Sequence, residues 1–363
     1  MDSYVVLAGP TLDQALALVR LGLIQATPSD ITRLERHACT GSAREFEEIR
    51  TRAPKELRSI LTTTRDRPAH VMVAHKSDLH PCNLVQHVLG SQLPEGSFMW
   101  LCEGVLAPSW PLFFTLRCRD EPSLSGRLML GMELCGSYSH LIVGDRSTNA
   151  YYRRPSRGAD DELVVKWNSP KIAPVLTGDA LSQYLDQAGG LKGVNRATEA
   201  LRYLLDGSAS PGESALALMA TLPCRLGGYG FSGMKLNPTI KVEKERRHLT
   251  RFDTYRPDGY LEALETDLEY ESDENHSGPK AVARDKARRN DIQALGIEVK
   301  DVTWEMLSHI DSLDLLFRQL LEKERTLGFD KRGRHRRQVA HPDSRAKRIT
   351  RLHELLPPWP YEG

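Results

Sequence analysis

Residues 256–276 read RPDGYLEALETDLEYESDENH, and residues 278–291 read GPKAVARDKARRND. The first stretch holds eight carboxylates and no Lys or Arg after its first residue, so it repels itself unless a cation lies among its side chains. The second stretch supplies five cations: Lys280, Arg284, Lys286, Arg288 and Arg289. An acidic segment that attracts metal ions is therefore joined directly to a cationic segment that can face phosphates.

The spacing of the acids selects three of them. Asp258 ends one short segment with strand character, Glu269 and Glu271 lie in the next, and residues 259–267 are short enough to be a hairpin connection. Because successive side chains of a strand point to opposite faces, Glu269 and Glu271 share a face and Tyr270 points to the other. We therefore expect three acids on one edge of a bent hairpin, where carboxylates can hold Mg²⁺ or Mn²⁺.

These residues resemble the PD-(D/E)XK nuclease superfamily, in particular the branch similar to very-short-patch-repair endonucleases. The resemblance is carried by RPDGYL, LEYESDENHSG and ARDKARRNDIQALGIEVKDVTWEML and covers residues 210–325. It implies an α/β restriction-endonuclease-like domain with a mixed sheet. It also implies a Mg²⁺- or Mn²⁺-dependent endonuclease that acts on DNA rather than RNA.

Carried over to this chain, the resemblance implies Asp258 and Glu269 as metal ligands and His276 as an auxiliary catalytic residue. Glu271 stands at the position that the family often gives to Lys or Asp. It is one methylene longer than Asp, which could shift a metal by on the order of 1 Å. Lys286 is the residue that could supply the missing positive charge.

Two of these assignments have structural alternatives. Glu213 matches the acid that joins the metal cluster from the first helix in related folds, yet Ser210, Pro211 and Glu213 also form the pattern of a helix cap. His276 precedes a helix start, so it either takes part in the chemistry or caps the helix and faces solvent.

Several cations are candidates for binding the phosphates of a nucleic acid. Arg284, Arg288 and Arg289 would clamp phosphates or, alternatively, pair with Asp285 and Asp291 as solvated charges. The basic tail at residues 326–363 is either a phosphate-binding arm or a partly disordered solubilising tail. The candidate nucleic-acid-binding residues are Lys280, Arg284, Arg288, Arg289, Arg334, Arg336 and Arg337.

The rest of the chain divides by its local patterns. Residues 1–65 are expected to be helical, as a helix-turn-helix or as packing helices. Residues 66–208 are expected to form an α+β region of helices and a small antiparallel sheet, ahead of a nuclease-like domain at 209–325. The N-terminal half more weakly resembles abortive-infection antitoxin-like regulators, which implies a DNA-associated, bacterial setting.

Composition excludes several classes of protein. The 363 residues carry a net charge of +1, and the six cysteines contain no Cys-x-x-Cys pair, which argues against a zinc ribbon or a disulfide scaffold. The chain begins without a signal-peptide pattern, and no apolar run approaches the ~20 residues of a membrane span. We therefore expect a cytoplasmic protein with no membrane partner.

The leading hypothesis is a metal-dependent nuclease with Asp258, Glu269 and Glu271 at its centre. The alternative is a catalytically inactive nucleic-acid-binding regulator or antitoxin-like protein. A third possibility is an accessory subunit of a larger complex, which acts beside a protein or guide-nucleic-acid partner.

Overall fold

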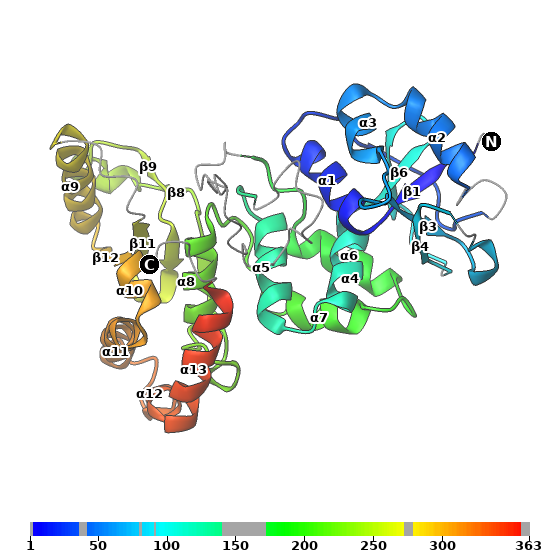
Figure 1. The fold of residues 1–363 in the computed structure, drawn as a ribbon. Helices are drawn as coiled ribbons and strands as arrows, with labels where there is room; N and C mark the ends of the chain where they lie inside the picture. The colour runs from blue at the N-terminus through cyan, green and yellow to red at the C-terminus, as the bar shows by residue number, and fades with distance from the viewer. Residues whose placement is uncertain are drawn as a thin grey trace. The chain divides into compact units, whose positions relative to one another are not determined.

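A computed structural model describes residues 3–35, 42–79, 82–90, 92–139, 172–271 and 279–356, although not the side chains of 279–285. The chain divides into two units (Figure 1). Unit 1 contains residues 1–134 and 139–202, and unit 2 contains residues 135–138 and 203–363. The division falls within a few residues of Ser208, where the sequence places a domain boundary.

Unit 1 is built on a six-stranded sheet with the order β2-β5-β6-β1-β3-β4. β1 pairs in parallel with β6 and β3 with β4, whereas the other neighbouring pairs are antiparallel. The strands are β1 (Val5–Leu7), β2 (Thr27–Pro28), β3 (His70–Val73), β4 (Val85–Val88), β5 (Phe98–Cys102) and β6 (Val105–Pro108). The sheet is therefore mixed, which corrects the expected small antiparallel sheet.

The first 65 residues are not a separate helical domain, which corrects a second expectation. Their β1 lies inside the six-stranded sheet, and its three residues have no exposed surface. Residues 4–7 are a short apolar run, and they are buried in the structure. In a sequence, such a run cannot be distinguished from a buried helix segment by its periodicity.

The described residues of unit 1 also form eight helical segments (Figure 1). They are α1 (Gly9–Arg20), α2 (Ala43–Arg52), α3 (Lys55–Leu61), η1 (Lys76–Asp78), α4 (Trp110–Asp120), α5 (Leu124–Leu134), α6 (Gly178–Gln187) and α7 (Val194–Leu201). The helices α4 to α7 lie within residues 66–208, where the sequence predicts helices beside a sheet. The mixed α/β character of the chain is thus confirmed.

Unit 2 contains a four-stranded sheet with the order β12-β11-β10-β7. β7 (Met234–Leu236), β10 (Gly259–Leu261) and β11 (Thr266–Glu271) pair antiparallel, and η4 (Glu262–Leu264) connects β10 to β11. β12 (Glu298–Thr303) pairs in parallel with β11, so the chain must cross over between them, and α9 (Pro279–Ala294) provides this crossover.

The remaining elements of unit 2 pack around this sheet. They are α8 (Pro211–Thr221), η2 (Cys224–Leu226), β8 (Ile240–Lys241), η3 (Lys244–Leu249), β9 (Thr254–Tyr255), α10 (Trp304–Ser308), α11 (Ile310–Thr326), α12 (Arg334–Ala340) and α13 (Pro342–Leu355). A cluster of Val242, Tyr255, Ile292, Leu295 and Ile297 joins the β8–β9 hairpin to the end of α9. In the part of the chain that the structure describes, no helix is long and apolar enough to cross a bilayer.

The basic C-terminal segment is folded, which corrects the expectation of a separate tail. Its α13 packs against α8 and η2, and Arg348 is only 2% exposed. The Arg348 guanidinium lies 3.0 Å from the Asp314 carboxylate and 4.7 Å from the centre of the Tyr229 ring. The Tyr229 hydroxyl donates a 2.7 Å hydrogen bond to the same carboxylate. A buried ion pair therefore fixes α13 to α11.

We predict that Arg348→Met lowers the free energy of unfolding of unit 2 by about 3 kcal/mol, because it leaves the buried Asp314 carboxylate without its main counter-charge. Arg345→Met is the matched control, since Arg345 binds the same Asp314 from a side chain that is 44% exposed, and should cost less than about 1 kcal/mol. Urea unfolding measures both. Equal, small losses would mean that the segment is a dispensable tail after all.

Candidate active site

Four carboxyl groups from three parts of unit 2 influence one another electrostatically. Glu213 belongs to the first turn of α8, Asp258 directly precedes β10, and Asp267 and Glu269 belong to β11. The charge of Glu269 raises the pKa of the other three carboxyl groups, in each case in addition to a larger effect of burial. The fold thus gathers acids that the sequence spreads over 57 positions, from 213 to 269.

The sequence predicts that a strand ends at Asp258, but Asp258 directly precedes β10, because residues 259–261 of the expected hairpin connection themselves form that strand. Its Oδ2 accepts a 2.9 Å hydrogen bond from the backbone N–H of Tyr270, which ties it to β11. Burial raises the pKa of Asp258 to about 8, and the charges of Glu213 and Glu269 add to this effect. An acid with such a pKa responds strongly to a cation placed beside it.

Asp267 is the site residue that sequence reasoning missed. It has no exposed surface, and among the described residues no N–H or hydroxyl group donates to either carboxylate oxygen, whose polar neighbour is the Glu269 carboxyl group. Burial, followed by the neighbouring Glu269 and then Asp258, raises the pKa of Asp267 to about 10. The signal was available, because Asp267 precedes Glu269 by two residues and therefore projects from the same face of β11.

Glu213 is part of a helix cap and also lies near the other acids, so both alternatives from the sequence apply to it. The Ser210 hydroxyl accepts a 3.1 Å hydrogen bond from the Glu213 backbone N–H, so Ser210 caps α8. The Glu213 Oε2 accepts hydrogen bonds from the Ala209 N–H at 2.9 Å and from Asn237 Nδ2 at 2.7 Å. The Asn237 backbone N–H also donates to the Asp258 carbonyl oxygen at 3.0 Å. Asn237, which the sequence analysis did not single out, thus holds Glu213 next to Asp258.

Two arginines of α9 bind the acids of the sheet, and Asp291 pairs instead with Arg251 at 3.1 Å. Arg288 lies 3.2 Å from Glu269, and Arg289 lies 3.3 Å from Glu271. Arg289 also pairs with Asp301, which lies opposite Glu269 in β12. Glu269 and Glu271 thus share one face of β11, as strand alternation predicts, and this face is turned toward α9.

Tyr270 lies on the opposite face of the sheet, as the alternation predicts. Its ring packs so closely on Gly212 of α8 that a Cβ at this glycine would come within 2.2 Å of the ring. A residue with a side chain at position 212 would therefore displace either the ring or the start of α8. This contact holds the helix that carries Glu213 against β11.

The other predicted site residues are not brought to the acids. Lys286 is exposed, and none of the hydrogen bonds or ion pairs in the described part of the chain joins it to them. His276 and the side chains of Lys280 and Arg284 lie outside the described residues.

The cations of α12 have their own surroundings. Arg334, Arg336 and Arg337 are exposed on this helix. Arg336 lies 3.7 Å from Glu322, and Arg337 donates to the Arg332 carbonyl oxygen. They are therefore surface charges on a folded helix, available to a polyanion.

The donor chemistry of the cluster suits a hard cation such as Mg²⁺ or Mn²⁺, which binds carboxylate oxygens. Asp267 in particular offers two buried oxygens that have no other partner in the described chain. Within these same residues, however, no group of three or more His, Cys, Asp or Glu side chains is arranged to hold a metal ion. Arg288 engages Glu269 at 3.2 Å, so a bound cation would compete with this guanidinium for the Glu269 carboxylate.

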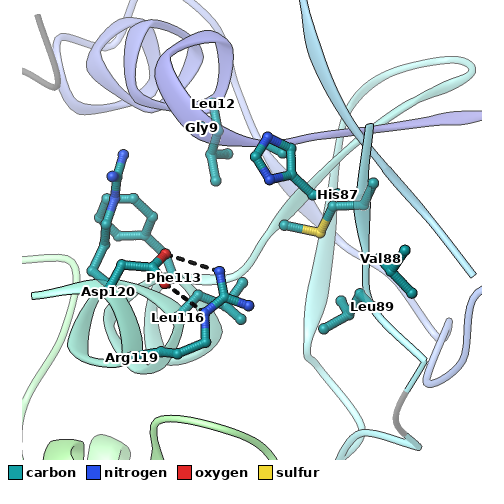
Figure 2. A pocket seen from close by; sticks show the side chains of 12 residues that line it. Gly9, Leu12, His87, Val88, Leu89, Phe113, Leu116, Arg119 and Asp120 are labelled. Atoms are coloured by element: carbon teal, nitrogen blue, oxygen red, sulfur yellow. Dashed lines mark hydrogen bonds and ion pairs between the residues drawn. The ribbon is translucent and has the colours of Figure 1, made fainter. Parts of the chain in front are cut away.

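Unit 1 has a pocket of its own, between the start of α1, β4 and α4, whose lining combines apolar side chains with four polar ones, His87, Arg117, Arg119 and Asp120 (Figure 2). His87 lies at the pocket, and its Nε2 is 3.0 Å from Nδ1 of His70. Burial lowers the pKa of His70 to about 4, to which His87 contributes. The pKa of His87 is also lowered, by burial and by Arg119 and Arg117, against the opposing effect of Asp120. The two imidazoles are therefore neutral at neutral pH.

A comparison with models of known protein families found no match to this chain. No curated protein and no solved structure matched it either. The chemistry of the site is therefore argued from its own residues.

We predict that the stability of unit 2 in metal-free buffer depends on pH through Asp267. Its pKa is raised on folding from near 4 to about 10, so its contribution to stability is complete below pH 4 and is lost as the pH rises toward 10. Asp267→Asn should therefore flatten the decline in stability over this range. Chemical unfolding at several pH values measures the effect.

Glu262→Gln is the control for this experiment, because Glu262 is an exposed acid of the same segment that pairs with Lys235 at 2.7 Å. It should leave the pH dependence unchanged. If Asp267→Asn also leaves it unchanged, Asp267 is not held as a buried acid.

The histidine pair generates a prediction of opposite sign for unit 1. Because folding lowers the pKa of His70 from about 6.5 to about 4, its neutral form stabilises the fold above pH 6.5, and this stabilisation is lost as the pH falls toward 4. His70→Asn should make the acid-side loss shallower in a thermal-unfolding series. His353→Gln, at an exposed position, is the control, and identical curves for both variants would contradict the assignment.

Proposed function

We propose that unit 2 is a metal-dependent phosphodiesterase that cleaves nucleic acid, DNA rather than RNA. The observation that carries this proposal is the Asp267 carboxyl group, which is fully buried beside the carboxyl groups of Glu269 and Asp258 and accepts no hydrogen bond from any N–H or hydroxyl group among the described residues. A buried acid without a partner is costly, and it persists where a function uses it.

A divalent cation would remove this cost. Asp258, Asp267 and Glu269 would hold the ion, since the charge of Glu269 raises the pKa of both aspartates and the charge of Asp258 adds to the increase at Asp267. When bound, the ion supplies charge neutralisation at a phosphate and an activated water. Glu213 would keep Asp258 in place through Asn237, and Glu271 would remain with Arg289.

The cations of α9 suit the substrate side of the site. Arg288 and Arg289 lie directly over the acids, so a phosphate that approaches the cluster meets guanidinium groups first. Guanidinium groups bind phosphate oxygens through two parallel hydrogen bonds. The preference for DNA rests on the resemblance of residues 210–325 to the very-short-patch-repair branch, in which His276, Lys280 and Arg284 would also face the substrate.

A second function is favoured by the same arginine contacts. Arg288 and Arg289 neutralise Glu269 and Glu271 without any metal, and no Lys follows Glu269 at the Glu-x-Lys position. These contacts support a non-catalytic protein that uses the domain to bind nucleic acid. Metal-dependent cleavage separates the two functions.

We predict that the purified protein cleaves plasmid DNA with Mg²⁺ or Mn²⁺ and is inactive in EDTA. Asp258→Asn, Asp267→Asn and Glu269→Gln should each lower the cleavage rate on the order of 10²-fold or more, because each removes a charge that holds the ion. The control Glu262→Gln should cleave at the wild-type rate, since this acid is exposed and pairs with Lys235.

Single-stranded DNA and RNA are tested in the same assay. If cleavage persists in Asp267→Asn and Glu269→Gln, the nuclease proposal fails. If no substrate is cleaved, yet all of these variants bind DNA with the same dependence on salt, the non-catalytic function holds instead.

A further inference from the structure

Unit 2 has a pocket between η2 and α13, and α13 belongs to the segment that reads as a basic tail in the sequence. The pocket has a volume of about 290 Å³. Its lining residues are Arg225, Leu226, Ala346, Lys347, Thr350 and Arg351. Three of these are cations, none is an acid, and the Thr350 hydroxyl donates a long hydrogen bond of 3.3 Å to the Ala346 carbonyl oxygen. Its volume far exceeds the ~30 Å³ share of one water molecule, so a phosphate group has room to enter.

Two of the three cations carry charge that nothing in the described chain compensates. Arg225 donates a 3.0 Å hydrogen bond to the Tyr203 hydroxyl, which is neutral. Lys347 is exposed, and no carboxylate in the described ranges pairs with it. Arg351 differs, because it is fixed to the Leu226 carbonyl oxygen at 2.9 Å and to Glu354 at 2.6 Å. Arg351 thus forms a wall of the pocket, and the other two provide its positive potential.

The backbone holds this pocket in a fixed shape. Gly227 adopts a φ of +86°, and a Cβ there would come within 2.5 Å of the Lys347 carbonyl oxygen. Only glycine allows α13 to lie so close to η2. The buried Arg348 points into the unit and binds Asp314, so its neighbour Lys347 is directed outward. A site that is ordered before its ligand arrives loses less entropy on binding.

The helix α8 sets the distance between this pocket and the acids. Glu213 lies beside the acid cluster in the first turn of α8, and Arg225 follows the end of the same helix by four residues. With a rise of about 1.5 Å per residue, the two sites are roughly 12–20 Å apart. This separation corresponds to about four to six base pairs of duplex DNA, at about 3.4 Å each.

We propose that the pocket formed by Arg225, Lys347 and Thr350 binds a backbone phosphate of the nucleic acid, several base pairs away from the phosphate at the acid cluster. This inference rests on the proposed function and adds a second point of contact to it. The pocket is lined by cations and a hydroxyl, with no aromatic ring for a base. Such a lining positions a nucleic acid and does not read its sequence.

The test is the salt dependence of binding to a labelled 24-base-pair duplex without added metal. Arg225→Gln/Lys347→Gln should reduce the slope of log K against log salt by about 1, as expected for one lost phosphate contact. Between 50 and 200 mM salt, the variant should then lose about fourfold less affinity than the wild type loses. Arg65→Gln/Arg67→Gln, at exposed positions of unit 1, removes the same charge and should leave the slope unchanged.

Thermal unfolding verifies that both double variants fold as the wild type does. The proposal is overturned by an unchanged slope in the pocket variant, by an equal change in the control, or by a pocket that binds inorganic phosphate while the duplex does not bind. Asp258→Asn separates this inference from the proposed function, because it should abolish cleavage and keep the wild-type slope. A nuclease whose pocket variant binds and cleaves like the wild type would refute the pocket alone.

Discussion

The Asp267 carboxyl group is buried at the centre of a four-stranded sheet, between β10 and β12, with Glu269 and Asp258 as its nearest charges. Burial of this kind favours the neutral acid, and the two neighbouring acids strengthen the preference. The rest of the site follows from that constraint. Arg288 and Arg289 lie over the sheet because its acids need counter-charge, and Asn237 donates a hydrogen bond to Glu213.

The same balance connects stability to function in unit 2. The acids can be neutralised by protons, by the arginines of α9 or by a divalent cation, and only the last of these provides a catalytic centre. Away from the acids, α13 is held by the buried pair of Arg348 and Asp314. Because of that pair, the basic segment of the sequence folds against the rest of unit 2. Lys347 and Arg225 then line the same pocket.

Local patterns predicted the parts of the chain that depend on local contacts. Ser210 does cap α8, and Glu269 and Glu271 do share a face of β11. The sequence could not show that β1 is an inner strand, because its three residues carry no alternation and acquire their partners from β3 and β6. The sequence also could not show which of the eight acids in residues 258–274 is buried. Asp267 is buried because β11 pairs with a strand on each side. Arg348 and Asp314 are likewise 34 positions apart, beyond the reach of any local pattern.

The central claim is that Asp267 and its neighbours form a site for a divalent cation. Titration of the protein with Mn²⁺, followed by the electron paramagnetic resonance signal of the free ion, tests it without any substrate. The account predicts one site in the wild type and in Glu262→Gln, and binding about 10-fold or more weaker in Asp267→Asn. Equal binding by the wild type and Asp267→Asn, or no binding by the wild type at millimolar Mn²⁺, would contradict it.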